Sequence, residues 1–175
     1  MFRKVKTIKL SPPQLLVTVF ITCVTIGAFL LKLPFTTVEG ISLIDAFFTA
    51  ASAMTVTGLV VVDTGEAFTI WGQLVILTLI QVGGIGIMTF AVLIFLMLGK
   101  KIGFKERLVL QQALNQTSVG GVIRLVRRII IFSFIIEGIA ILLLAYRWIP
   151  EYGWLEGFYA SVFHAISAFN NAGFS

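Results

Sequence analysis

The amino-acid sequence predicts an all-α membrane protein made of repeated units, each a helix, a re-entrant loop and a second helix. Hydrophobic residues make up 58% of the 175 residues and charged residues only 12%, and the mean hydropathy is +1.04. So few polar side chains could not cover a compact soluble domain. Three apolar runs are long enough to cross a bilayer, which takes about 20 helical residues. An internal repeat at an offset of 115 residues is the third observation.

The first apolar run, Gln14 to Leu33, is predicted to span the membrane. Basic residues precede it, so a cleaved signal peptide is an alternative, but the run continues past the poor cleavage site at Thr25–Gly27 and favours a retained helix. Leu43 to Met54 is also apolar and helix-compatible, but about 12 residues are too few to span. We therefore expect a re-entrant helix, whose open backbone end must be surrounded by protein or line a watery cavity.

The second and third spans are predicted at Ile70 to Leu98 and Leu125 to Ile149. Gln81 and three glycines lie near the middle of the second span, where glycine permits close approach of another helix and indicates a packing seam; the glycines are Gly83, Gly84 and Gly86. Glu137 lies in the middle of the third span, where a carboxylate is costly in lipid and should face the bundle interior or water. A role in ion passage and a neutral, hydrogen-bonded structural role both stay open.

The charged residues are segregated along the chain, whose formal net charge is +5. Lys and Arg crowd the N-terminus and the segment from Gly99 to Arg128, so both are predicted to face the cytoplasm. Acidic residues lie on the opposite side: Glu39, Asp45, Asp63, Glu66, Glu151 and Glu156. A nucleic-acid site is the poorer interpretation, because the basic segments flank spans and lack an aromatic binding face. The lone Cys23 predicts neither a disulfide framework nor a metal cluster.

This pattern divides the chain into three parts. Residues 1–99 form the first unit, residues 100–124 a basic cytoplasmic linker, and residues 125–175 the first helix and re-entrant loop of a second, incomplete unit. Within the linker, Phe104 to Gln116 predicts an amphipathic helix and Ser118 to Gly121 a turn.

The repeat carries the predicted chemistry. Phe48 to Leu59 aligns with Phe163 to Phe174, and Phe, two Ala, Ser and Gly recur in register. Each copy ends in a small, glycine-containing turn, and such an extended backbone can offer carbonyl oxygens to a cation that loses its water. Gly58 and Gly173 make that backbone geometry accessible. The hydroxyls of nearby threonines can coordinate or hydrogen-bond, and the negative end of the preceding helix would point at the cation.

At these residues the sequence resembles the Trk/Ktr/HKT superfamily of potassium transporters, and in particular its Ktr-type membrane subunits (KtrB). The most specific segments are Ser52 to Leu59 and Phe169 to Ser175. The resemblance implies four covalently linked helix, pore-loop, helix repeats around one pore, of which this chain would hold one and a half. It also implies that the glycine at Gly58 favours potassium over sodium. The selectivity-filter residues implied by the resemblance are Thr55, Val56, Thr57, Gly58, Asn170, Asn171, Ala172 and Gly173.

The resemblance further implies a multi-pass plasma-membrane protein with a cytoplasmic N-terminus, which forms homodimers with one pore per subunit. A cytoplasmic ring of nucleotide-binding regulatory proteins (KtrA-like) would gate it, with the nucleotide on that ring. The basic linker from Gly99 to Arg128 lies on the side expected for contact with the ring. We expect no enzyme activity and no cofactor in this chain, only potassium in the filter. Four repeats would need roughly 460 residues, so the chain is expected to be part of a longer protein.

Three alternatives stay open. A secondary transporter of another solute would also use broken helices. A sodium-permeable relative would use a similar filter, and in a membrane scaffold the glycine turns would only serve packing. His164 has no second histidine beside it in the sequence and is expected to be structural rather than a metal ligand.

Overall fold

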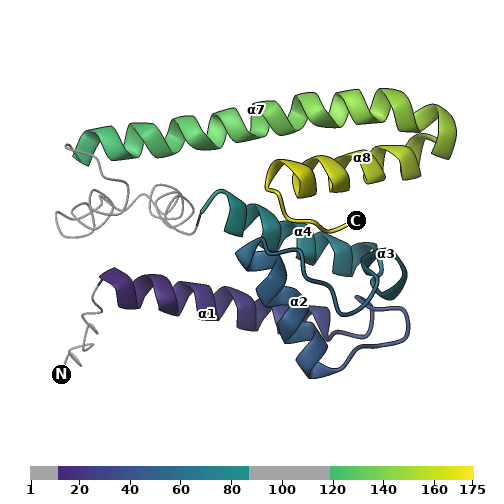
Figure 1. Ribbon diagram of the computed structural model, residues 1–175, viewed down its shortest axis with the longest axis horizontal. Helices are drawn as coiled ribbons and strands as arrows, with labels where there is room; N and C mark the ends of the chain where they lie inside the picture. Colours follow the sequence, from purple (N-terminus) through teal and green to yellow (C-terminus); the bar gives the residue numbers. More distant parts are fainter. Residues whose placement is uncertain (1–11, 87–118) are drawn as a thin grey trace, which may run out of the picture.

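The computed structural model describes residues 12–86 and 119–175, and within these ranges the fold is all-helical, as the sequence predicts (Figure 1). The only strand-like pairing among these residues is an isolated antiparallel bridge between Thr37 and Phe68. The helices are α1 (Pro12–Leu31), α2 (Leu43–Thr55), α3 (Thr64–Ala67), α4 (Ile70–Gly84), α7 (Val119–Tyr152) and α8 (Trp154–Phe169).

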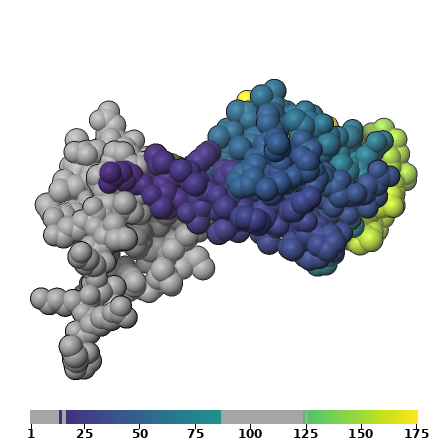
Figure 2. Space-filling model, turned by 90° about the horizontal axis from the view of Figure 1, so that it is seen from below, coloured from purple at the N-terminus to yellow at the C-terminus, as the bar shows by residue number. Residues whose placement is uncertain are grey.

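Helices α1, α2 and α4 pack together as one layer, and Figure 2 shows α1 and α2 side by side on the lower face. The inner face of α2 carries Ala46, Ala50 and Ala53, all fully buried. Alanine side chains let neighbouring helices approach closely. In lipid the hydrophobic effect does not drive helices together, so their association depends on close packing of this kind. This packing covers one face of the short helix α2 with protein, while Ile44 and Phe48 on the rest of its surface are exposed. A re-entrant segment requires protein or a watery cavity around its open backbone end.

The loop from α1 to α2 is held by hydrogen bonds to backbone groups at the ends of the two helices. The Thr36 hydroxyl lies 3.0 Å from the Leu31 carbonyl and 2.7 Å from the Leu33 carbonyl, where α1 has run out of intrahelical donors. Ser42 caps α2 and accepts a 3.0 Å bond from the Asp45 amide. The first turn of α2 is therefore specified locally, and the helix begins at Leu43, as predicted.

Helices α7 and α8 form an antiparallel pair above α4 (Figure 1). Among the described residues, Val126–Tyr152 of α7 is the one helix long and apolar enough to cross a membrane; Val17–Leu31, Leu43–Thr55 and Ile70–Gly84 are shorter apolar helices. Pro150 lies in the last turn of α7, and Gly153 with φ +83° reverses the chain. A Cβ on Gly157 would lie 2.7 Å from the Trp148 carbonyl oxygen, so glycine is needed for α8 to turn back against α7.

Three sequence expectations differ from the structure. The second span, predicted from Ile70 to Leu98, is helical in the described residues only as far as Gly84, and Gly86 has φ +89°. Residues 119–121, predicted as part of a turn, are helical, because α7 begins at Val119 and not at Leu125. Glycine weakens a helix but does not forbid it, and the apolar run continues through Val122 and Ile123. Helix α3 was not expected; Asp63 nucleates it by accepting from the Gly65 and Glu66 amides at 2.9 and 3.1 Å.

Several predictions lie outside the described residues. These are the basic N-terminus, the end of the second span towards Leu98, the linker up to residue 118 and the amphipathic helix at Phe104 to Gln116. The division of the chain into units accordingly stays a prediction.

Candidate functional site

Helix α2 ends in a left-handed turn closed by two backbone bonds. Val56 has φ +56°, and its amide donates to the Ala53 carbonyl at 3.2 Å, while the Thr57 amide donates to the Ser52 carbonyl at 3.0 Å. This pair of bonds is the Schellman arrangement, which satisfies carbonyls left free at a helix C-terminus. A β-branched valine in the left-handed region is uncommon and is held there by its surroundings.

Helix α8 ends in the same way, 115 residues later. Asn171 has φ +55°, and the Asn171 and Ala172 amides donate to the Ala168 and Ser167 carbonyls at 3.0 and 2.7 Å. Each dihedral and each bond has its counterpart at the sequence offset of the repeat. The two aligned segments therefore adopt one backbone conformation as well as sharing residues.

Gly58 and Gly173 lie against each other at the tips of the two turns. Their φ angles are +73° and +71°. A Cβ on Gly58 would lie 2.5 Å from the Ala172 carbonyl oxygen, and a Cβ on Gly173 would lie 3.3 Å from the Gly58 Cα. Glycine is required at Gly58 for two reasons, the positive φ and the close approach of the second turn.

The threonine side chains brace the first turn. The Thr55 hydroxyl donates to the Ala51 carbonyl at 2.8 Å and lies 3.2 Å from the Thr57 hydroxyl. Thr57 in turn donates to the Ser52 hydroxyl at 3.1 Å. These hydroxyls make the hydrogen bonds that the sequence allows for them.

Ser167 braces the second turn, which sequence reasoning did not predict. Its buried hydroxyl donates to the Phe174 carbonyl at 2.6 Å and accepts from the Phe174 amide at 3.1 Å. The recurrence of serine at Ser52 and Ser167 was the available signal.

The side chain of Asn170 does not join the turn but faces α4 and α7. Its amide nitrogen lies 3.0 Å from the Gln81 Oε1 and 2.9 Å from the Ile166 carbonyl oxygen. The Gln81 amide nitrogen donates to both carboxylate oxygens of Glu137, at 2.8 and 2.9 Å. Glu137, Gln81 and Asn170 form what we call the polar cluster. Glu137 is only 3% exposed, so it faces the bundle interior, as one of the two sequence expectations requires.

Two adjacent glycines of α4 receive the ends of the two short helices. A Cβ on Gly83 would lie 2.0 Å from the Met54 carbonyl oxygen of α2, and a Cβ on Gly84 would lie 1.8 Å from the Asn170 Oδ1 of α8. The packing seam that the sequence indicates in this span is confirmed at both residues.

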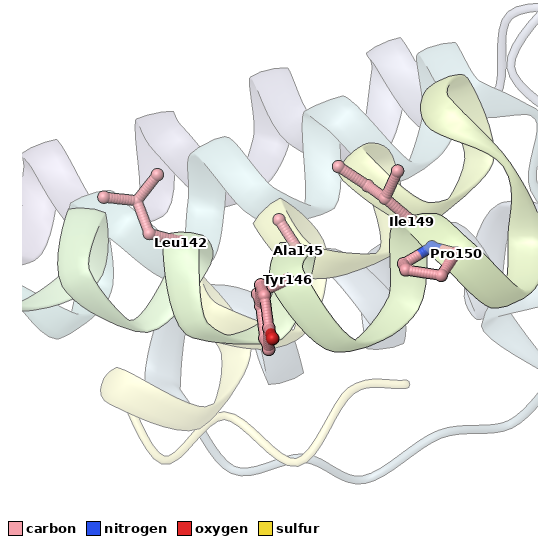
Figure 3. A pocket seen from close by; sticks show the side chains of 5 residues that line it. All are labelled: Leu142, Ala145, Tyr146, Ile149 and Pro150. Atoms are coloured by element: carbon pink, nitrogen blue, oxygen red, sulfur yellow. The ribbon is translucent and has the colours of Figure 1, made fainter.

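Two further features lie away from the turns. His164 packs edge-to-face on Trp148 with 5.0 Å between ring centroids, as a structural histidine does. Figure 3 shows an apolar groove on the outer side of α7, lined by Leu142, Ala145, Tyr146, Ile149 and Pro150. It offers no charged side chain to an ion.

Comparison with known proteins gives a consistent family. Residues 9–175 match the family model TrkH, described as "Cation transport protein". The Ktr system potassium uptake protein B of Bacillus subtilis is 60% identical over 98% of this chain and 38% of its own length. The protein of the same name from Vibrio alginolyticus is 42% identical over 93% of this chain and 36% of its length. The potassium/sodium uptake protein NtpJ of Enterococcus hirae is 45% identical over 95% of this chain and 37% of its own length.

This chain therefore spans less than two fifths of the length of these relatives. The family match covers nearly all of this chain. The apolar helices of the structure agree with a family of membrane transporters. The family is one of transporters and not of enzymes. The chain belongs to the TrkH family of cation transport proteins.

Proposed function

We propose that the complete protein takes up potassium through a channel-like pore, and that the turns at residues 55–58 and 170–173 are two strands of its selectivity filter. The contact between Gly58 and Gly173, both with positive φ, carries the proposal. This contact brings together two segments 115 residues apart, each in the turn that directly follows the end of its helix.

The electrostatics of the two short helices support a cation as the substrate. Helices α2 and α8 end at turns that touch, so their C-termini converge. Each helix C-terminus carries a partial negative charge of about half an elementary charge. Two such ends at one place stabilise a cation that has exchanged water for backbone carbonyl oxygens.

We extend the proposal to the remaining architecture, with the family resemblance and the relatives' names as its support. We propose repeated helix, pore-loop, helix units, one and a half of four in this chain, in a multi-pass plasma-membrane protein with its N-terminus in the cytoplasm. The Bacillus subtilis relative is named as part of a Ktr system. A homodimer gated by a cytoplasmic nucleotide-binding ring is the corresponding assembly, and the basic segment 99–128 is its proposed contact.

The decisive experiment measures potassium and sodium uptake by cells that lack their own potassium uptake and express the complete protein or its Gly58→Ser variant. Serine adds a Cβ 2.5 Å from the Ala172 carbonyl oxygen, so the variant must displace the second turn. We expect the unchanged protein to restore potassium uptake and the variant to lose its preference for potassium. Uptake that ignores Gly58 would place the ion path elsewhere and favour a secondary transporter. A correctly inserted protein that moves neither ion would favour a membrane scaffold.

A sodium-permeable pore is the second candidate, favoured by one observation. NtpJ, at 45% identity, is named for both potassium and sodium. The same uptake measurement separates the two candidates, because a potassium filter excludes sodium at equal concentration.

A further inference from the structure

The polar cluster joins three helices that are distant in sequence. Gln81 of α4 lies 56 residues from Glu137 of α7 and 89 residues from Asn170 of α8. Glu137 is buried, and Gln81 and Asn170 are half-buried. A buried carboxylate is tolerated only with good hydrogen-bond donors, and here Gln81 supplies them to both oxygens.

The hydrogen bonds of the polar cluster fix the orientation of the Gln81 side-chain amide. In its ionised form the Glu137 carboxylate only accepts hydrogen bonds, so it holds the nitrogen end of the Gln81 amide towards itself. The oxygen end of Gln81 then faces α8, where it accepts from Asn170 at 3.0 Å. Glu137 thereby decides which end of Gln81 meets Asn170.

Asn170 links the Gln81 amide to the backbone of the second turn. It directly precedes Asn171, the left-handed residue of the turn, and its amide nitrogen also holds the Ile166 carbonyl of its own helix at 2.9 Å. Gly84 leaves room for its Oδ1 against the backbone of α4. The first turn lacks such a clamp: the aligned residue Thr55 bonds locally to Ala51.

We propose that Glu137 and Gln81 are positioning residues that set the selectivity of the pore by orienting the second glycine turn through Asn170. The proposal rests on the proposed function, since it assigns these residues a task in the same filter. Any shift of Asn170 is carried to Gly173, three residues on, and so alters its contact with Gly58.

An exchange of the two partners tests the proposal in the complete protein. Glu137→Gln sets an amide nitrogen against the Gln81 nitrogen, and Gln81→Glu sets two carboxylates against each other. The double variant Glu137→Gln with Gln81→Glu restores one carboxylate, one amide and an acceptor for Asn170. We expect the potassium-to-sodium uptake ratio to fall about tenfold in each single variant, the scale of one lost hydrogen bond to a charged group, and to return in the double variant.

A double-mutant cycle with Asn170→Ala separates positioning from a direct effect of the Glu137 charge on the ion. If Glu137 acts through Asn170, Glu137→Gln adds nothing to the ratio in the Asn170→Ala background. A charge that acts directly would lower the ratio by the same factor in both backgrounds, and that result would overturn the proposal. Asn170→Ala keeps the Gln81–Glu137 bonds, so it stays informative if a single exchange variant fails to insert.

Two further variants complete the comparison. The uptake of every variant is measured at equal amounts of inserted protein. Thr78→Val, one turn before Gln81, removes an exposed hydroxyl that donates to the Leu74 carbonyl of its own helix, and should leave the ratio unchanged. Gly58→Ser reports on the filter itself. The positioning role is refuted if the potassium-to-sodium ratio falls with Gly58→Ser but not with the cluster variants. It is also refuted if the double variant does not recover the ratio. In both cases the proposed selectivity filter still stands. A ratio that ignores Gly58→Ser as well refutes the proposed function.

Discussion

The backbone of Gly83 lies directly against the Met54 carbonyl, since a Cβ on Gly83 would come within 2.0 Å of that oxygen. This contact seats the C-terminal end of α2 on α4. It makes the position of the first turn depend on the absence of a single methyl group.

Gly83→Ala should therefore destabilise the protein, although alanine is the better helix former. Overpacking of this kind costs about 1–3 kcal/mol, which exceeds the gain of about 1 kcal/mol in helix propensity. The midpoint of thermal unfolding in detergent should fall. Gly138→Ala in α7 is the matched control, because a Cβ there meets nothing within 4 Å, and its midpoint should stay level or rise. Equal midpoints for the two variants would contradict the packing seam.

Gly58→Ala and Gly40→Ala separate backbone strain from the contact between the turns. Both residues have positive φ, +73° and +82°, so alanine is strained by about 1–2 kcal/mol at either. Only at Gly58 does the added Cβ meet the other turn. We expect both variants to lose stability, but only Gly58→Ala to lose potassium preference in an uptake assay. A change of selectivity in Gly40→Ala would mean that strain alone explains the effect.

Ser167→Ala should loosen the second turn. It removes the partner of both the Phe174 amide and the Phe174 carbonyl, which are buried, and each unpaired group costs about 1–3 kcal/mol. Hydrogen exchange of the Phe174 amide should accelerate. Ser52→Ala, the aligned change, removes only an acceptor for the Thr57 hydroxyl and should have the smaller effect. The reverse order would show that the two turns are braced differently from what the hydrogen bonds indicate.

Tyr159→Phe should weaken the attachment of α8 to α4 by about 1 kcal/mol, the scale of one hydrogen bond. The Tyr159 hydroxyl donates to the Gln73 Oε1 at 2.7 Å, and Gln73 in turn donates to the Phe68 carbonyl at 3.0 Å. Thermal unfolding of the variant beside Gln73→Leu and the double variant measures the coupling. Fully additive losses would show that the two side chains do not act as a pair.

The helices could be predicted where their causes are local. The apolar run Leu43 to Met54 predicted α2 to within one residue of its observed end at Thr55. A run too short to span the membrane is readily identified as a re-entrant helix. The start of α7 was missed because the glycine pair 120–121 signals a turn by composition, whereas the flanking apolar residues continue the helix.

The candidate site was predictable only as far as the backbone repeats. The offset of 115 residues finds Gly58 and Gly173, which the structure brings together. The family resemblance implies that Asn170, which aligns with Thr55, belongs to the filter, yet the two side chains differ in length and bond to different partners. No spacing rule in a sequence pairs Glu137 with a glutamine 56 residues away.

The polar cluster also bears on how the chain is assembled during synthesis. Gln81 leaves the ribosome before Glu137, and Asn170 follows last. A carboxylate near the middle of a spanning helix costs a few kcal/mol at insertion, unless a donor is already in the membrane. We therefore expect the first helical layer to assist the insertion of α7. Insertion of residues 119–152 should be more efficient behind residues 12–86 than alone, and Glu137→Leu should abolish the difference.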